Sequence, residues 1–92
     1  MKYIWDEEKN NINIKKHGID FADVNEMFDY PMLTGLDITG DYNEDRWIGI
    51  GMLRNIVAVI VFTEINENTI RIISARKATK NERVQYEKAI KY

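Results

Sequence analysis

Residues 56–62 read Ile-Val-Ala-Val-Ile-Val-Phe, and this apolar run decides the fold. Its β-branched side chains favour an extended strand. Because apolar side chains occupy both sets of alternating positions, both faces of the strand should be covered by other elements. The run therefore predicts a central strand over residues 56–63. On either side of it, residues 46–53 and 69–76 predict neighbouring strands, joined to it by short connections at 54–55 and 64–68.

Residues 6–18 carry a full set of helix signals. Asp6 is a suitable N-cap, acidic residues fill the first turn and basic residues fill the last turn. These charges are favourable to the helix dipole, and Gly18 readily takes the left-handed backbone that follows a helix. The segment predicts a helix over residues 7–17.

Two further helices are expected. Asp20 precedes apolar residues at helical spacing, and Pro31 prevents this helix from continuing. Thr79 and Glu82 form a capping box that opens a last helix, which runs to about Ile90.

Short strands over residues 2–5 and 32–36 complete an expected order of β-α-α-β-β-β-β-α. A chain of 92 residues suits a single small domain. The order predicts one α+β domain over residues 1–92, with helices packed on a small, largely antiparallel sheet.

The composition narrows the class of protein. There is no cysteine, which excludes disulfides, zinc–thiolate sites and a cysteine nucleophile. No apolar run approaches the roughly 20 residues of a membrane span, and the N-terminus lacks the core of a signal peptide. We expect a soluble cytoplasmic protein that does not interact with a membrane.

The net charge of −2 hides a strong asymmetry. Residues 1–70 hold 6 basic and 13 acidic side chains, whereas residues 71–92 hold 7 basic and 2 acidic ones. Residues 19–45 alone contain eight acids and no base. Such a chain can bind an anion at its basic end and a cationic partner at its acidic end, although faces of different sign are also common on solvated surfaces.

Chemically useful residues gather where the last strand meets the last helix. Arg71, Arg76 and Lys77 come from the strand and its end, and Glu82 and Tyr86 come from the helix. Fixed cations beside side chains that can transfer protons are suited to the cleavage of a phosphodiester, because the negative charge on the phosphate grows in the transition state. Regular alternation along the strand places Arg71 and Lys77 on one face and Arg76 on the other.

Several basic residues also have a structural interpretation. Arg71 is equally suited to a salt bridge with a carboxylate of the acidic half, and Arg46 to an ion pair with Glu44 or Asp45. Glu82 is first of all a capping residue. Neighbouring cations lower the pKa of such a carboxyl, which weakens it as a general base and favours an orienting role.

The first helix presents Lys9, Asn13, Lys16 and His17 on one face. This face is either merely solvated, with His17 as a C-terminal cap, or it borders the groove of the last helix and touches phosphates. His17 is the only histidine, so a mechanism that needs two histidines of one chain is excluded.

Three other motifs fail. Residues 41–45 resemble the start of a calcium loop, but the glycine and the final glutamate of such a loop are missing. Ser74 lacks the glycines of a nucleophile elbow, and Gly49-x-Gly51 lacks the continuation of a phosphate loop. We expect no metal and no cofactor.

An ordered set of residues runs through about eighty positions of the chain: Trp5-Asp6, Lys9, Asn13, Lys16-His17-Gly18 and Phe21, then Arg46 and Gly51, then residues 71–78, Glu82-Arg83 and Tyr86. In this set the chain resembles the BrnT family of bacterial toxins.

The resemblance implies a RelE-like toxin fold and metal-independent cleavage of RNA. It also implies neutralisation by a BrnA-like antitoxin with a ribbon-helix-helix part, and repression of the shared operon by the complex through that part's binding to operator DNA. A departure is that this chain is acidic overall, so its affinity for RNA would come from the basic C-terminal end.

These observations favour a ribonuclease toxin in which a 2′-hydroxyl attacks the neighbouring phosphate. The candidate catalytic residues are Arg71, Arg76, Lys77, Glu82, His17 and Tyr86. The candidate RNA-binding residues are Arg46, Lys9, Lys16 and Arg83. The alternative is a non-catalytic interaction or co-repressor module that binds nucleic acid or protein through its basic end.

Overall fold

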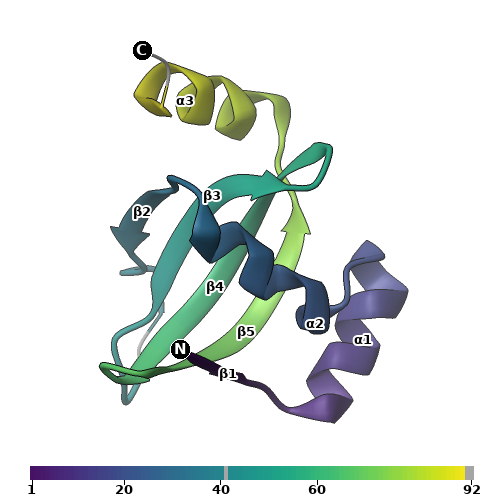
Figure 1. Cartoon of the computed structure of the whole chain (residues 1–92), viewed down its shortest axis with the longest axis vertical. Coiled ribbons are helices and arrows are strands. Elements are labelled where there is room, and N and C mark those ends of the chain that lie inside the picture. Colours follow the sequence, from purple (N-terminus) through teal and green to yellow (C-terminus); the bar gives the residue numbers. More distant parts are fainter. Residues whose placement is uncertain (41, 91–92) are drawn as a thin grey trace.

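A computed structural model describes residues 1–40 and 42–90, and within these residues five strands form one mixed sheet (Figure 1). The strands are β1 (Lys2–Ile4), β2 (Leu33–Leu36), β3 (Trp47–Leu53), β4 (Ile56–Asn66) and β5 (Thr69–Lys77). They lie in the order β1-β5-β4-β3-β2, and every neighbouring pair is antiparallel except β1 and β5, which are parallel. The predicted α+β fold with a largely antiparallel sheet is confirmed, and the apolar run lies in the central strand.

The helices are α1 (Glu7–His17), α2 (Phe21–Val24) and α3 (Lys80–Ile90), with a 3₁₀ helix, η1 (Asn25–Asp29), directly after α2. The expected caps are present. The side chain of Asp6 accepts hydrogen bonds from the backbone N–H groups of Glu8 and Lys9, and Gly18 has a φ of 71°. The helix expected after Asp20 is shorter than the prediction, because it tightens into the 3₁₀ helix from Asn25 onward.

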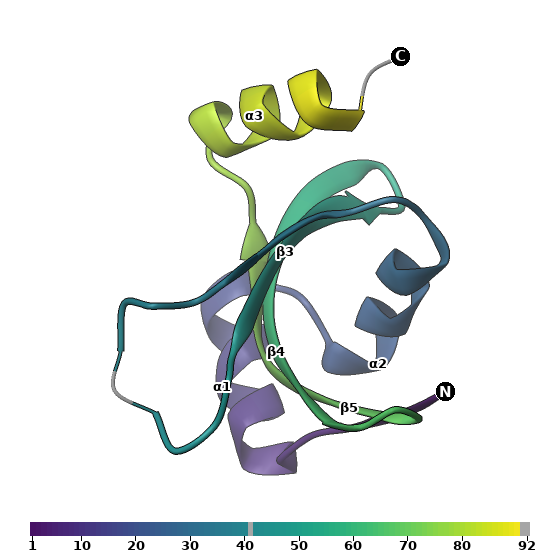
Figure 2. The same ribbon diagram turned by 90° about the vertical axis from the view of Figure 1, so that its left-hand side faces the viewer.

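One face of the sheet, which we call the closed face, is covered by α2 and η1. Phe21, Val24 and Met27 are fully buried there, against the side of β4 that carries Ala58, Ile60 and Phe62. Figure 2 shows α2 on this side of the sheet. Burial of these side chains supplies most of the hydrophobic core.

The opposite side of β4, which carries residues 57, 59, 61 and 63, we call the open face. Helix α3 covers only one end of it, where Tyr86 packs with Ile50, Val57, Val59 and Ala78. Toward the other end, Ile48 and Val61 remain half-buried. The central strand is thus covered completely on one side and partly on the other.

A β-bulge in β5 changes which side chains share a face. Val61 pairs with Ser74 and Phe62 pairs with Ile72, so Ile73 is an extra residue. Arg71 pairs with Thr63, and Arg76 pairs with Val59, which places both arginines on the open face. The prediction from regular alternation, that Arg71 and Arg76 lie on opposite faces, is therefore wrong.

The same bulge separates Arg71 from Lys77, which regular alternation places on the face of Arg71. Ala75 pairs with Ile60 and Lys77 pairs with Ala58, so both stand at closed-face positions. Lys77 ends the strand and is exposed.

Two buried asparagines of α1 hold the helix to the rest of the fold. The side chain of Asn13 donates to the backbone oxygens of Ile19 and Ala75, both at 2.9 Å, and accepts from the backbone N–H of Ala75 at 3.2 Å. The side chain of Asn10 donates to Asp20 and accepts from the backbone N–H of Phe21. Asn13 is thus a structural residue, whereas Lys9, Lys16 and His17 of the same helix are exposed.

Across the described ranges, 1–40 and 42–90, no helix is long and apolar enough to cross a membrane.

Candidate functional site

The open face gathers basic side chains from three parts of the chain. Strand β5 contributes Arg71 and Arg76, with Ser74 between them on the same face. Arg46 comes from the segment before β3 and shares a partner with Arg71. Helix α1 lies beside β5 and α3 lies over one end of the face (Figures 1 and 2).

Arg76 and Glu82 form a two-pronged ion pair. Nη1 of Arg76 lies 2.7 Å from Oε1 of Glu82, and Nη2 lies 2.8 Å from Oε2. The same carboxylate accepts the backbone N–H of Thr79 at 2.8 Å, while the hydroxyl of Thr79 accepts the backbone N–H of Glu82. The predicted capping box therefore exists, and it fixes the carboxylate that orients Arg76.

These contacts determine the charge state of Glu82. The hydrogen bond from Arg76, followed by that from Thr79, lowers the pKa of Glu82 from 4.5 to about 2 despite partial burial. The hydrogen bond to Glu82 likewise raises the pKa of Arg76. Glu82 is ionised at neutral pH and holds its proton too weakly to serve as a good general base, so its geometry suits orientation of Arg76.

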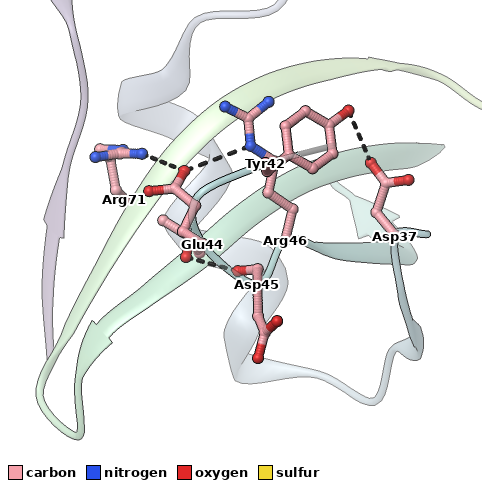
Figure 3. A network of polar contacts seen from close by, with 7 residues as sticks. Asp37, Tyr42, Glu44, Asp45, Arg46 and Arg71 are labelled. Atoms are coloured by element: carbon pink, nitrogen blue, oxygen red, sulfur yellow. Dashed lines mark hydrogen bonds and ion pairs between the residues drawn. The ribbon is translucent and has the colours of Figure 1, made fainter. Parts of the chain in front are cut away.

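A second group joins Arg71, Glu44 and Arg46 (Figure 3). Nη2 of Arg71 lies 2.5 Å from Oε2 of Glu44, and Nε of Arg46 lies 3.4 Å from that same oxygen. The guanidinium of Arg46 also stacks on the ring of Tyr42, with its central carbon 3.9 Å from the ring centroid. The predicted ion pairs of Arg46 with Glu44 and of Arg71 with the acidic half of the chain are both present.

Helix α1 and the bulged part of β5 enclose a shallow hollow of about 220 Å³. Its walls are Lys9, Ile12, Asn13, Lys16, His17, Ile73 and Ser74. The basic side chains of α1 and the imidazole of His17 thus border β5 at the level of Ser74, between its two arginines.

The remaining candidate residues lie around α3. Tyr86 is only 8% exposed and packs in the apolar cluster under the helix, and it lines a separate hollow with Met52 and Arg54. Arg83 is exposed on the helix surface, and Lys77 is exposed at the end of β5. The structure thus brings together Arg71, Arg76, Glu82 and Arg46 on one face, whereas Tyr86 is buried between α3 and one end of that face.

Residues 5–82 match a family of proteins that is described as the ribonuclease toxin, BrnT, of type II toxin–antitoxin systems. The chain belongs to the BrnT family. The resemblance seen in the sequence is confirmed, and both arginine–glutamate groups lie inside the matched segment. Arg83 and Tyr86 lie beyond it.

A solved structure from the BrnT family is similar to most of this chain. The crystal structure of the Brucella abortus ribonuclease toxin BrnT matches with a TM-score of 0.66 and 33% sequence identity. The match covers 87% of this chain and 99% of that one. No curated protein sequence matches the chain.

Proposed function

We propose that the protein is an endoribonuclease toxin that binds an RNA strand across the open face of the sheet. The observation that carries this proposal is the bulge at Ile73, which brings Arg71 and Arg76 to one face beside the basic side of α1. An extended polyanion crossing that face would meet cations along its length.

The proposed reaction needs no cofactor. The 2′-hydroxyl oxygen of one nucleotide forms a bond to the adjacent phosphorus, and the bond from phosphorus to the 5′-oxygen of the next nucleotide breaks. The products are a 2′,3′-cyclic phosphate and a 5′-hydroxyl. One proton leaves the 2′-hydroxyl and another reaches the departing oxygen, so the protein has to position the strand, stabilise charge and move protons.

Arg76 is assigned to the phosphate that is cleaved. Glu82 holds its guanidinium in one orientation through both terminal nitrogens, and the side chain is still 40% exposed. A guanidinium has five N–H donors, so Arg76 retains donors for a phosphate oxygen while the ion pair persists. Pre-oriented donors of this kind stabilise the extra charge of the transition state.

Proton transfer is assigned to His17, with Lys16 and Lys9 as phosphate contacts on the same helix. An imidazole gives and takes protons near neutral pH, and His17 lines the hollow that reaches Ser74. Lys77 and Arg83, both exposed, are assigned to weaker contacts with RNA outside the reacting group. Tyr86 is assigned to packing under α3.

Membership of a toxin–antitoxin family supports an antitoxin partner. We assign to this role a BrnA-like ribbon-helix-helix protein that covers the open face and excludes RNA, and whose DNA-binding part allows the complex to repress the operon. The toxin would then act in the cytoplasm, where its RNA substrates are.

The deciding experiment incubates the purified protein with an RNA and with a DNA of the same sequence, both in EDTA. We expect RNA fragments ending in cyclic phosphate and intact DNA, because only RNA has the attacking hydroxyl. Equal cleavage of both polymers, or a requirement for added metal, would refute the mechanism. RNA binding without cleavage, together with normal growth of bacteria that express the chain alone, would favour the non-catalytic module.

A further inference from the structure

Two arginines from distant parts of the chain converge on one oxygen of Glu44 on the open face. Arg71 lies 27 residues beyond Glu44, and Arg46 lies two residues beyond it. Their side chains come from different elements and approach the oxygen from different directions (Figure 3). Together they define a position for an anionic oxygen.

The backbone of Arg71, and both the backbone and the guanidinium of Arg46, have contacts other than those with Glu44. Arg71 sits in the sheet between β4 and β1, paired with Thr63 on one side and Ile4 on the other. Arg46 stacks on Tyr42, and its backbone oxygen accepts the N–H of Asp37 at 2.7 Å. The fold therefore fixes the backbone positions of both arginines, and Glu44 comes from the same segment before β3 as Arg46.

Asp37 is the next carboxylate in this network, and it has its own partners. Its oxygens accept hydrogen bonds from the hydroxyl and the backbone N–H of Thr39 and from the hydroxyl of Tyr42. These bonds lower the pKa of Asp37, with the hydroxyl of Thr39 contributing most and the charge of Arg46 least. Glu44 is the carboxylate that bridges the two arginines.

We infer that Arg46 and Arg71 form a binding subsite for a backbone phosphate of RNA, which Glu44 fills in the free protein and vacates when RNA binds. This inference rests on the proposed function, in which RNA crosses the open face. Guanidinium groups bind carboxylate and phosphate oxygens with the same donors and similar geometry. The exposed fractions of the side chains, 37% for Arg71, 31% for Glu44 and 23% for Arg46, leave the site accessible and the existing ion pairs weak.

The subsite lies apart from the phosphate assigned to Arg76. The partners of Arg71 and Arg76 in β4, Thr63 and Val59, are four residues apart, which corresponds to about 13 Å along a strand. Arg76 is held toward Glu82 and Arg71 toward Glu44, so we assign a separate phosphate to each arginine. The subsite therefore takes a phosphate that flanks the cleaved one, and Glu44 limits affinity for the strand.

The test measures binding of a short 2′-O-methyl RNA, which cannot be cleaved by the proposed route, to the wild type and to Glu44→Gln over a range of salt. We expect Glu44→Gln to bind roughly fivefold more tightly, because removing one anion removes two competing ion pairs. The slope of log affinity against log salt should steepen by up to about 0.7, the value for one phosphate contact on a single strand, because in Glu44→Gln this contact no longer replaces an existing ion pair.

The matched control is Glu26→Gln. Glu26 also pairs with an arginine, Arg54, at 3.2 Å, and its replacement makes the same change in net charge. We expect its affinity to change by less than about twofold, since the lost charge lies outside the subsite. In addition, Arg71→Ala in the Glu44→Gln background should return the affinity to the wild-type value or below.

The inference would be overturned by equal tightening in both glutamine variants, by weaker binding of a folded Glu44→Gln protein, or by no binding of RNA to the wild type and Glu44→Gln. Glu44→Asp provides a second variant, because it keeps the charge but shortens the side chain, and it should also bind more tightly than wild type. The oligonucleotide cannot be cleaved, so these results stand even if the protein fails to cut RNA. If the wild type cleaves ordinary RNA but Glu44→Gln binds the 2′-O-methyl RNA no more tightly than the wild type, the phosphate subsite is refuted and the proposed function stands.

Discussion

Two arginine–glutamate contacts lie on the same face of the sheet and differ in how the carboxylate is used. Arg76 and Glu82 are six residues apart and meet through two nitrogens and two oxygens, and Glu82 also caps α3. Arg71 and Glu44 are 27 residues apart, and a single oxygen of Glu44 serves two arginines. The first carboxylate positions its arginine, whereas the second stands where a different anion can bind.

The largest expected effect belongs to Arg76→Ala. We expect RNA cleavage to fall by about a hundredfold to a thousandfold, which is typical for loss of one group that stabilises transition-state charge. The free energy of unfolding should fall by about 1 kcal/mol or less, because no large cavity forms at a partly exposed strand end. Cleavage assays and thermal melts measure the two quantities.

Arg54→Ala is the control for Arg76→Ala. Arg54 also pairs with two carboxylates, those of Asp23 and Glu26, but it lies on the turn between β3 and β4. Its replacement should leave cleavage near the wild-type rate. Full activity of both Arg76→Ala and Arg71→Ala in folded proteins would show that the site has been misplaced.

Glu82→Gln should have the next largest effect. The amide keeps much of the capping box but loses the charge that holds Arg76 in place. We expect kcat to fall by about tenfold to a hundredfold with little change in KM, since a small displacement of a reacting group is costly. Glu87→Gln removes the same charge from an exposed position of α3 and should leave kcat unchanged. A Glu82→Gln protein with wild-type kcat would reduce Glu82 to a capping residue.

Arg46→Ala and Arg71→Ala should change binding more than chemistry. We expect each to raise KM by about threefold to tenfold and to leave kcat within about twofold, as for a lost contact with a flanking phosphate. Steady-state kinetics on one RNA measures both constants. A fall in kcat for Arg71→Ala as large as that for Arg76→Ala would place both arginines at the cleaved phosphate and remove the contrast between the two groups.

The smallest expected effect is on stability in acid. Because the pKa of Glu82 is lowered from 4.5 to about 2 in the folded protein, its contribution to stability is complete above pH 4.5 and is lost as the pH falls toward 2. We expect a loss of about 1 kcal/mol for this partly exposed pair. Melting curves should show an acid loss that is larger by this amount in the wild type and in Glu44→Gln than in Glu82→Gln, since Asp37, whose pKa is also lowered, remains in all three proteins.

The sequence predicts those structural features correctly whose determining residues are close together in the chain. The caps Asp6 and Gly18, the capping box of Thr79 and Glu82, and the apolar run of β4 each lie within a few residues of the structure they determine. The lowered pKa of Glu82 also followed from neighbouring cations, because its partner Arg76 is only six residues away.

The sequence does not predict features that depend on contacts between residues far apart in the chain. The bulge at Ile73 depends on the register of β5 against β4, and no glycine or proline marks it. Residues 19–45 contain eight acidic side chains, each a possible partner of Arg71. The sequence does not show which of them pairs with Arg71, and the folded structure shows that it is Glu44. Asn13 looked like part of a polar face, but its partner Ala75 lies 62 residues away.

The bond between Asn13 and Ala75 also bears on how the sheet meets other chains. An outermost strand has unpaired backbone groups that can recruit a strand from another molecule. On one side of this sheet, β1 pairs with the start of β5, and farther along β5 the amide of Asn13 binds both the N–H and the C=O of Ala75 in place of a further strand. On the other side the outermost strand is β2, with four residues. A strand from another chain therefore cannot pair with β5 at Ala75, next to Arg76, while Asn13 holds this position.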